Sequence, residues 1–208
     1  MVYDRTQTID EFLAAAAAKQ PTPGGGSVTA LVGALAASMG EMVVNYSIGK
    51  KDLAEHQAEL KESLAEFGRA RQMLLELMIE DQAGFEMLST VRKLPPGDAQ
   101  RQGKFHAALL TCIRVPQAIA ALAAAVLQLC EKLVDRVNRY LLSDLAVCAE
   151  LSVATIRCAA YNVRINLHDL SDAPERKKFD DWAARQVQEA SKAIQRLMPH
   201  IWAWQERP

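Results

Sequence analysis

The apolar positions of this chain recur at helical spacing, and no stretch of useful length alternates apolar and polar residues as a strand does. Glycine and proline are gathered in a few places, and glycine is absent after Gly103. The pattern predicts an all-α bundle of about six helices, several of them long and antiparallel. The expected helices cover residues 8–19, 27–44, 52–92, 99–134, 143–167 and 175–198.

Local signals mark where several of these helices begin, bend or end. Thr8 with Glu11 three residues later fits a capping box at a helix start. Pro116 is expected to kink the fourth helix, and Pro199 to end or kink the last one. In the second helix small residues recur, which favours close approach of neighbouring helices. They are Gly33, Ala36, Ala37 and Gly40.

Length and composition suit one soluble domain covering residues 1–208. Half of the residues are hydrophobic but only 6% are aromatic, so the core is expected to be built from small and aliphatic side chains, as in close-packed helices. Lys and Arg number 24 against 25 Asp and Glu, a net charge of −1. This balance excludes the basic footprint of a dedicated nucleic-acid binder.

The cysteines and the apolar stretches bear on the compartment. The four cysteines form no CxxC pair, and no histidine stands at zinc-ligand spacing, which predicts buried free thiols and no metal site. No apolar run typical of a secretory signal opens the chain. The uncharged stretches 28–40 and 115–130 are shorter than the roughly 20 apolar residues of a membrane span. We therefore expect a cytoplasmic protein that does not enter a membrane.

A glycine-rich segment is the first candidate for chemistry. Gly24, Gly25 and Gly26 stand before Ser27, at the predicted start of a helix. Backbone N–H groups at such a start attract anions, but a plain connection that needs the freedom of glycine explains the segment equally well. The spacing matches neither a Rossmann nor a P-loop fingerprint.

The predicted fifth helix carries a polar stripe on one face, at spacings of three and four residues. Its members are Asp144, Cys148, Leu151, Thr155, Cys158, Asn162 and Asn166. The two asparagine amides suit the edge of a heteroaromatic amide, or they satisfy a neighbouring helix terminus. Asp144 stands eighteen residues before Asn162, about 27 Å along a continuous helix. The two ends of the stripe therefore serve a long ligand, or a symmetric partner brings opposite ends together.

Two further charged residues are candidates on weaker grounds. Asp81 lies within an apolar part of the third helix, where a carboxylate can stabilise a cation or move a proton. A solvated acidic face shared with Glu76 and Glu80 is equally compatible with the spacing. Lys50 follows a helix end, which it can simply cap.

Several segments together resemble the cyclodeaminase/cyclohydrolase family. This family includes the cyclodeaminase half of formiminotransferase-cyclodeaminase and the free-standing bacterial methenyltetrahydrofolate cyclohydrolases. The likeness spans about residues 8–170 and rests on Pro23-Gly24-Gly25-Gly26-Ser27, Glu41-Met42-Val43, Gly49-Lys50-Lys51, Glu80-Asp81 with Phe85, Lys93-Leu94-Pro95, Val115-Pro116, Asn138, Ser143-Asp144 and residues 162–167. Val137 stands where the family usually has glycine, and Ser47 where it often has threonine.

The resemblance implies an all-α homodimer that binds a tetrahydrofolate adduct near the subunit interface, as substrate and without a separate cofactor. The favoured activity is hydrolysis of 5,10-methenyltetrahydrofolate to 10-formyltetrahydrofolate. One alternative is a cyclodeaminase that releases ammonia from 5-formiminotetrahydrofolate. A second alternative, of another class, is a non-catalytic helical dimer that binds folate. It is considered because the departure from the family pattern at Val137 is compatible with a lost activity.

The resemblance also assigns roles to residues. Asp144 and Asp81 are the implied acid/base or cation-stabilising carboxylates. Lys50 and the glycine segment are expected to hold the glutamate tail or another anion, and the asparagines to contact the pterin or the linker amide. The implied substrate-binding residues are Gly24, Gly25, Gly26, Ser27, Lys50, Asn138, Ser143, Asn162 and Asn166.

Overall fold

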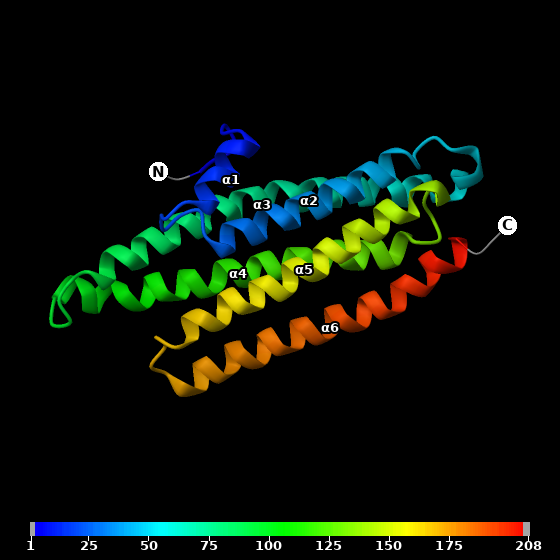
Figure 1. Ribbon diagram of the computed structural model, residues 1–208. Coiled ribbons are helices and arrows are strands. Elements are labelled where there is room, and N and C mark those ends of the chain that lie inside the picture. The colour runs from blue at the N-terminus through cyan, green and yellow to red at the C-terminus, as the bar shows by residue number, and fades with distance from the viewer. Residues whose placement is uncertain (1–2, 206–208) are drawn as a thin grey trace.

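The computed structural model describes residues 3–205, which form six α-helices and two short 3-10 helices without a strand (Figure 1). The prediction of an all-α fold with about six helices is confirmed. The elements are α1 (Ile9–Ala17), α2 (Gly25–Asn45), η1 (Lys51–His56), α3 (Gln57–Arg92), α4 (Ala99–Leu133), η2 (Arg139–Leu141), α5 (Leu142–Leu167) and α6 (Ala173–Gln205).

The five long helices lie side by side as an elongated bundle, with the short α1 across one side (Figure 1). α5 packs against α2 and α4, α2 also packs against α3, and α6 covers α5 and α4 from outside. Contacts at both ends show that α2 and α5 run antiparallel: Asn162 reaches Thr29, whereas the Asn138 backbone N–H reaches Ser47. The start of α2 therefore lies beside the end of α5.

Local signals in the sequence explain several helix ends. The capping box is confirmed, because the Thr8 hydroxyl accepts from the Glu11 N–H while the Glu11 carboxylate accepts from the Thr8 N–H. Asp98 caps α4 by accepting from the backbone N–H of Gln100 and Arg101. The helix expected from residue 52 begins instead with the 3-10 turn η1, because Leu53 has non-helical backbone angles.

The small residues of α2 allow the close packing that the sequence predicts. A Cβ on Gly40 would lie 2.4 Å from the Phe67 ring of α3, and one on Gly33 would lie 3.1 Å from both Leu74 and Thr155. Glycine is therefore required at Gly40 for close approach rather than for an unusual backbone angle. This contact fixes α2 between α3 and α5.

Two prolines lie within helices of the structure, Pro116 in α4 and Pro199 in α6. Pro199 does not end the last helix, since α6 continues to Gln205. Leu197 and Ile201 on either side of the proline are buried in the core, and this packing offsets the loss of one helical hydrogen bond. Pro116 likewise lies inside the continuous helix α4.

The cysteines and apolar stretches require two corrections. Cys130 and Cys148 are buried as predicted, with their Sγ atoms 3.3 Å apart, but Cys112 is half-buried and Cys158 is exposed. α2 and α4 are long and apolar enough to cross a membrane by length and composition, so shortness alone does not exclude a span. Both nevertheless pack inside the bundle, with 56% and 44% of their apolar windows buried.

Candidate functional site

One end of the bundle holds a cleft of about 260 Å³ where the glycine segment meets α3, α4 and α5. Polar groups face apolar walls in it, as is typical of small-molecule sites. The lining residues are Pro21, Thr22, Gly24, Gly25, Gly26, Asp81, Phe85, Arg92, Cys112, Pro116, Asn162, Ile165 and Asn166.

Asp81 is the central charged group of this cleft. It projects from α3 onto the first turn of α2, where its Oδ2 accepts a hydrogen bond of 2.9 Å from the Ser27 hydroxyl. Burial raises the pKa of the Asp81 carboxyl, although hydrogen bonds from the Ser27 side chain and backbone oppose this change. The alternative of a solvated acidic face is therefore wrong for Asp81. A partly buried carboxyl with a raised pKa that faces a cleft is suited to accept and return a proton.

The glycine segment is shaped around this carboxylate. A Cβ on Gly26 would lie 2.0 Å from Asp81 Oδ1, far inside van der Waals contact, whereas one on Gly24 would meet nothing closer than 3.7 Å. The anion at the positive end of the α2 dipole is thus the protein's own Asp81. Ser27 is buried and bonded to Asp81, so it positions the carboxylate instead of lining the cleft.

The two asparagines of α5 meet different partners. Asn162 donates to the Thr29 hydroxyl at 3.2 Å, which ties α5 to the first turn of α2. Asn166 donates through Nδ2 to the Cys112 carbonyl at 3.1 Å and to the Asn162 carbonyl at 2.9 Å. Pro116, four residues after Cys112, has no N–H for that carbonyl. Asn166 supplies the missing donor, so its amide nitrogen is used within the fold while both asparagines still line the cleft.

Cys112 and Arg92 complete the cleft. The pKa of the Cys112 thiol is raised to about 11, mainly by burial and then by the Asp81 charge, with Arg92 acting in the opposite direction. Cys112 therefore stays a neutral thiol at physiological pH. Arg92, at the end of α3, forms an ion pair with Asp169, just after α5.

The other predicted residues lie at the opposite end of α2 and α5. Lys50 precedes η1, and Asn138 precedes η2, whose Tyr140 N–H donates to the Asn138 side chain at 3.3 Å. Ser143 and Asp144 are in the first turn of α5, exposed and half-buried respectively. Because α5 is continuous, Asp144 is about 27 Å from Asn162 along the axis. The single chain does not bring the two groups together.

Val137, the departure from the family pattern, is accommodated without strain. No described residue other than glycine has a positive φ angle, so the backbone at Val137 is one that any residue adopts. Its side chain is buried in the core beside Leu142 and Val134. The glycine usual in the family is therefore not needed for the backbone shape here.

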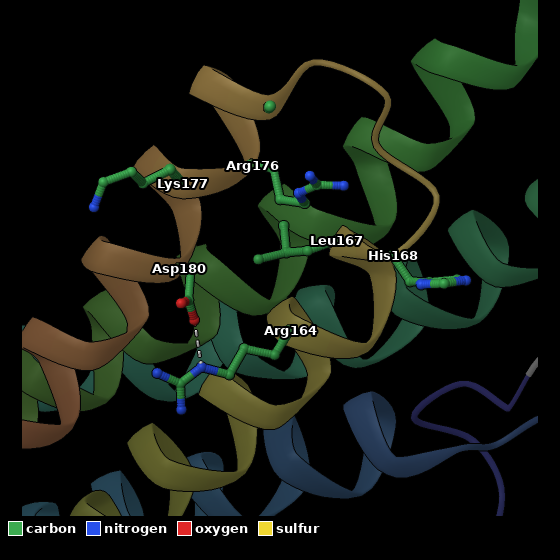
Figure 2. A pocket seen from close by; sticks show the side chains of 7 residues that line it. Arg164, Leu167, His168, Arg176, Lys177 and Asp180 are labelled. Carbon is green, nitrogen blue, oxygen red and sulfur yellow. Dashed lines mark hydrogen bonds and ion pairs between the residues drawn. The ribbon is translucent and has the colours of Figure 1, made fainter.

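A second cavity, of about 630 Å³, lies between the end of α5 and the start of α6 (Figure 2). Its basic side chains are largely engaged: Arg164 donates to Asp180 at 2.7 Å, as Figure 2 shows, and Lys177 pairs with Asp181 at 3.1 Å. Among the residues that the structure describes, no three acidic, histidine or cysteine side chains gather as a metal-binding group.

The sequence pattern indicates the glycine segment, Asp81 and the two asparagines of this cleft. It does not indicate Arg92, Cys112 or the apolar wall as site residues. Phe85 and Arg92 follow Asp81 by four and eleven residues, which places all three on one face of α3. That spacing was the available signal. Cys112 has no such signal, and Pro116 stands out only through the family resemblance, because the place of both in the cleft depends on how α4 packs against α5.

Comparisons with known proteins support a common family. The formiminotransferase-cyclodeaminase family model matches residues 8–189. A methenyltetrahydrofolate cyclohydrolase of Methylorubrum extorquens is 35% identical over 179 residues, which cover 83% of this chain and 86% of that protein. A formimidoyltransferase-cyclodeaminase of Gallus gallus is 26% identical over 191 residues, 90% of this chain but 35% of that longer protein. The crystal structure of formiminotetrahydrofolate cyclodeaminase from Thermotoga maritima matches with a TM-score of 0.81 and 27% identity, covering 96% of each chain.

Proposed function

Because this chain belongs to the formiminotransferase-cyclodeaminase family, we propose that it is an enzyme that hydrolyses 5,10-methenyltetrahydrofolate to 10-formyltetrahydrofolate. The observation that carries the proposal is a carboxyl of raised pKa, Asp81, set in a cleft with apolar walls. The likeness to a cyclohydrolase of nearly the same length favours this activity over the alternatives.

The reaction needs a group that takes up and returns a proton beside a cation. Water adds to the methenyl carbon between N5 and N10, and the water loses a proton to the Asp81 carboxylate as the C–O bond forms. The bond from that carbon to N5 then breaks, and Asp81 returns the proton to N5. The hydroxyl on that carbon loses its proton to solvent, which leaves a neutral formyl group on N10. The positive charge of the substrate is thus released as one proton. Asp81 in its ionised form also stabilises the cationic substrate before attack.

The second implied carboxylate, Asp144, acts in this proposal from a partner subunit. The enzyme is a homodimer whose twofold axis sets α2 and α5 of one subunit against those of the other in opposite directions. Asp144, Ser143, Asn138 and Lys50 of one chain then face the cleft of its partner. Asp144 and Asn162 of one chain are about 27 Å apart, and this arrangement explains how both can serve one site, because two subunits complete each site.

An exposed apolar surface on α2 and α5 supports this dimer. Val28 and Leu35 on α2, with Val147, Tyr161 and Ile165 on α5, are between 39% and 75% exposed. The two helices are neighbours, and this surface lies between the two groups of site residues. Apolar residues exposed together on adjacent helices mark an interface more often than an open surface. A second copy of the same chain covers them while completing both sites.

The proposal is tested by turnover. Purified protein should remove the methenyl absorbance of 5,10-methenyltetrahydrofolate, while ammonia release from 5-formiminotetrahydrofolate would instead identify the cyclodeaminase. The cyclodeaminase alternative has support from the crystal structure to which the chain is similar. Folate binding without turnover of either substrate would indicate the non-catalytic dimer and refute the enzyme.

A mixing experiment tests the shared site. Asp81→Asn and Asp144→Asn should each be inactive and folded. Mixed and re-equilibrated, they should recover up to about a quarter of wild-type activity, because half of the dimers are mixed and each mixed dimer has one intact site. Absence of recovery, with mixed dimers shown to form, would refute a site built from both subunits.

The remaining features of the proposal follow from the substrate. The folate is the substrate, and the reaction uses water and side chains of the protein rather than an added cofactor. The partners are the small-molecule folate and a second copy of the chain, without nucleic acid or membrane. The free thiols Cys130 and Cys148, 3.3 Å apart and unbridged, support a reducing, cytoplasmic location.

A further inference from the structure

The start of α2 is already occupied by an anion, so a second anion has to bind elsewhere. The Asp81 carboxylate lies against the Ser27 hydroxyl and fills the space beside Gly26. A ligand carboxylate placed on the glycine segment would meet this carboxylate in a partly buried setting, where like charges repel strongly. The anionic end of a ligand that reacts at Asp81 must therefore point away from the glycine segment.

The cleft face of α3 indicates where that end lies. Asp81, Phe85 and Arg92 all line the cleft and follow one another along this helix. Arg92 stands about 16 Å from Asp81 along the helix axis, with the aromatic ring of Phe85 between them. The order along the cleft is a carboxylate, an aromatic ring and a guanidinium.

Arg92 is held in place while part of it stays accessible. One guanidinium nitrogen, Nη2, pairs with Asp169, and the side chain remains 40% exposed. Asp169 is itself fixed at the end of α5 by a backbone hydrogen bond to Asn166. A guanidinium has five N–H donors, so the pair leaves others for a carboxylate. Among the described residues that line this cleft, Arg92 carries the one cationic side chain.

We infer that Arg92, oriented by Asp169, binds a carboxylate of the substrate's glutamate tail and so sets how the folate lies in the cleft. The one-carbon centre then lies at Asp81 and the aminobenzoyl ring beside Phe85. This inference rests on the proposed folate substrate. Lys50, the other cation considered for the tail, lies at the opposite end of the bundle within one chain, and in the proposed dimer it reaches this cleft only from the partner subunit.

The test compares substrates with and without the glutamate. Wild-type protein should use 5,10-methenyltetrahydrofolate with a higher kcat/KM than the N-methylamide of 5,10-methenyltetrahydropteroate, which keeps the linker amide but lacks the glutamate and has no carboxylate. Arg92→Gln should raise KM for the folate about tenfold or more with little change in kcat, since a charge-assisted pair is lost. The same substitution should leave the values for the pteroate amide unchanged, so the preference between the two substrates disappears. Asp169→Asn should have a smaller effect of the same kind.

Arg164→Gln is the matched control, because Arg164 is a paired surface arginine in the neighbouring cavity (Figure 2). It should change neither substrate. Equal loss for both substrates in Arg92→Gln, or a wild type indifferent to the glutamate, would overturn the inference while the proposed activity stands. If the wild type turns over neither substrate, the activity itself fails. Equilibrium binding of tetrahydrofolate and of the N-methylamide of tetrahydropteroate to wild type and Arg92→Gln then decides carboxylate recognition in the same way.

Discussion

Replacing Gly26 by alanine tests whether the glycine segment exists to let Asp81 approach α2. The new Cβ would lie 2.0 Å from Asp81 Oδ1, while real Cβ contacts essentially never fall below 3.0 Å. The carboxylate must therefore retreat by about 1 Å, or the first turn of α2 must move by as much. Either movement weakens the hydrogen bond from Ser27.

The expected effects on stability and on activity differ in size. Forcing a methyl group into a packed site costs about 1–3 kcal/mol, and the better helix propensity of alanine returns up to about 1 kcal/mol. The free energy of unfolding should therefore fall by no more than about 3 kcal/mol. Activity should fall further, since a displacement of about 1 Å of a catalytic group costs on the order of a hundredfold in rate.

The assay is kcat/KM for loss of methenyl absorbance, with urea unfolding measured on the same samples. Gly68→Ala is the control, because Gly68 lies outside the cleft and its Cβ would meet nothing closer than 4.0 Å; it should lower neither activity nor stability. In an Asp81→Ala background, Gly26→Ala should no longer destabilise, since the atoms it meets are gone. Near wild-type activity in Gly26→Ala, or an unchanged stability cost without Asp81, would refute the reasoning.

Two further predictions concern stability. Burial raises the pKa of Asp81 above its value of 3.8 in the unfolded chain, so its stabilising contribution is present below pH 3.8 and is lost as pH rises through the folded pKa. Asp81→Asn should therefore raise the urea midpoint at pH 8, and the difference from wild type should narrow as pH falls through the folded pKa of Asp81 toward 3.8; a constant difference would contradict the assigned cause. Gly40→Ala should destabilise by about 1–2 kcal/mol, because its Cβ would meet the buried Phe67 ring at 2.4 Å, whereas Gly68→Ala, open to 4.0 Å, should stabilise by up to about 1 kcal/mol. Equal effects in thermal unfolding would show that helix propensity rather than packing controls α2.

Much of the fold was determined by local signals in the chain. These signals depend on neighbours within a few positions along the chain. They are the capping box of Thr8 and Glu11, the cap of α4 at Asp98 and the helical spacing of apolar residues. The small residues of α2 are visible in the sequence, but their effect is tertiary, since Gly33 and Gly40 allow α3 and α5 to approach closely. Of the two outcomes expected at Pro199, the end of the helix does not occur, because tertiary packing of Leu197 and Ile201 outweighs that local preference.

The candidate site likewise has features that the sequence indicates and features that only the packing of the helices decides. Sequence alone supplied Asp81, the glycine segment, Asn162 and Asn166 as candidates, and the separation of Asp144 from Asn162 along a continuous helix. Only the tertiary structure decided that Asp81 is the anion at the start of α2, that Asn166 serves a carbonyl left without a donor by Pro116, and that Arg92 faces the cleft. These facts join residues from different helices, so they depend on how the helices pack, which no spacing within one helix specifies.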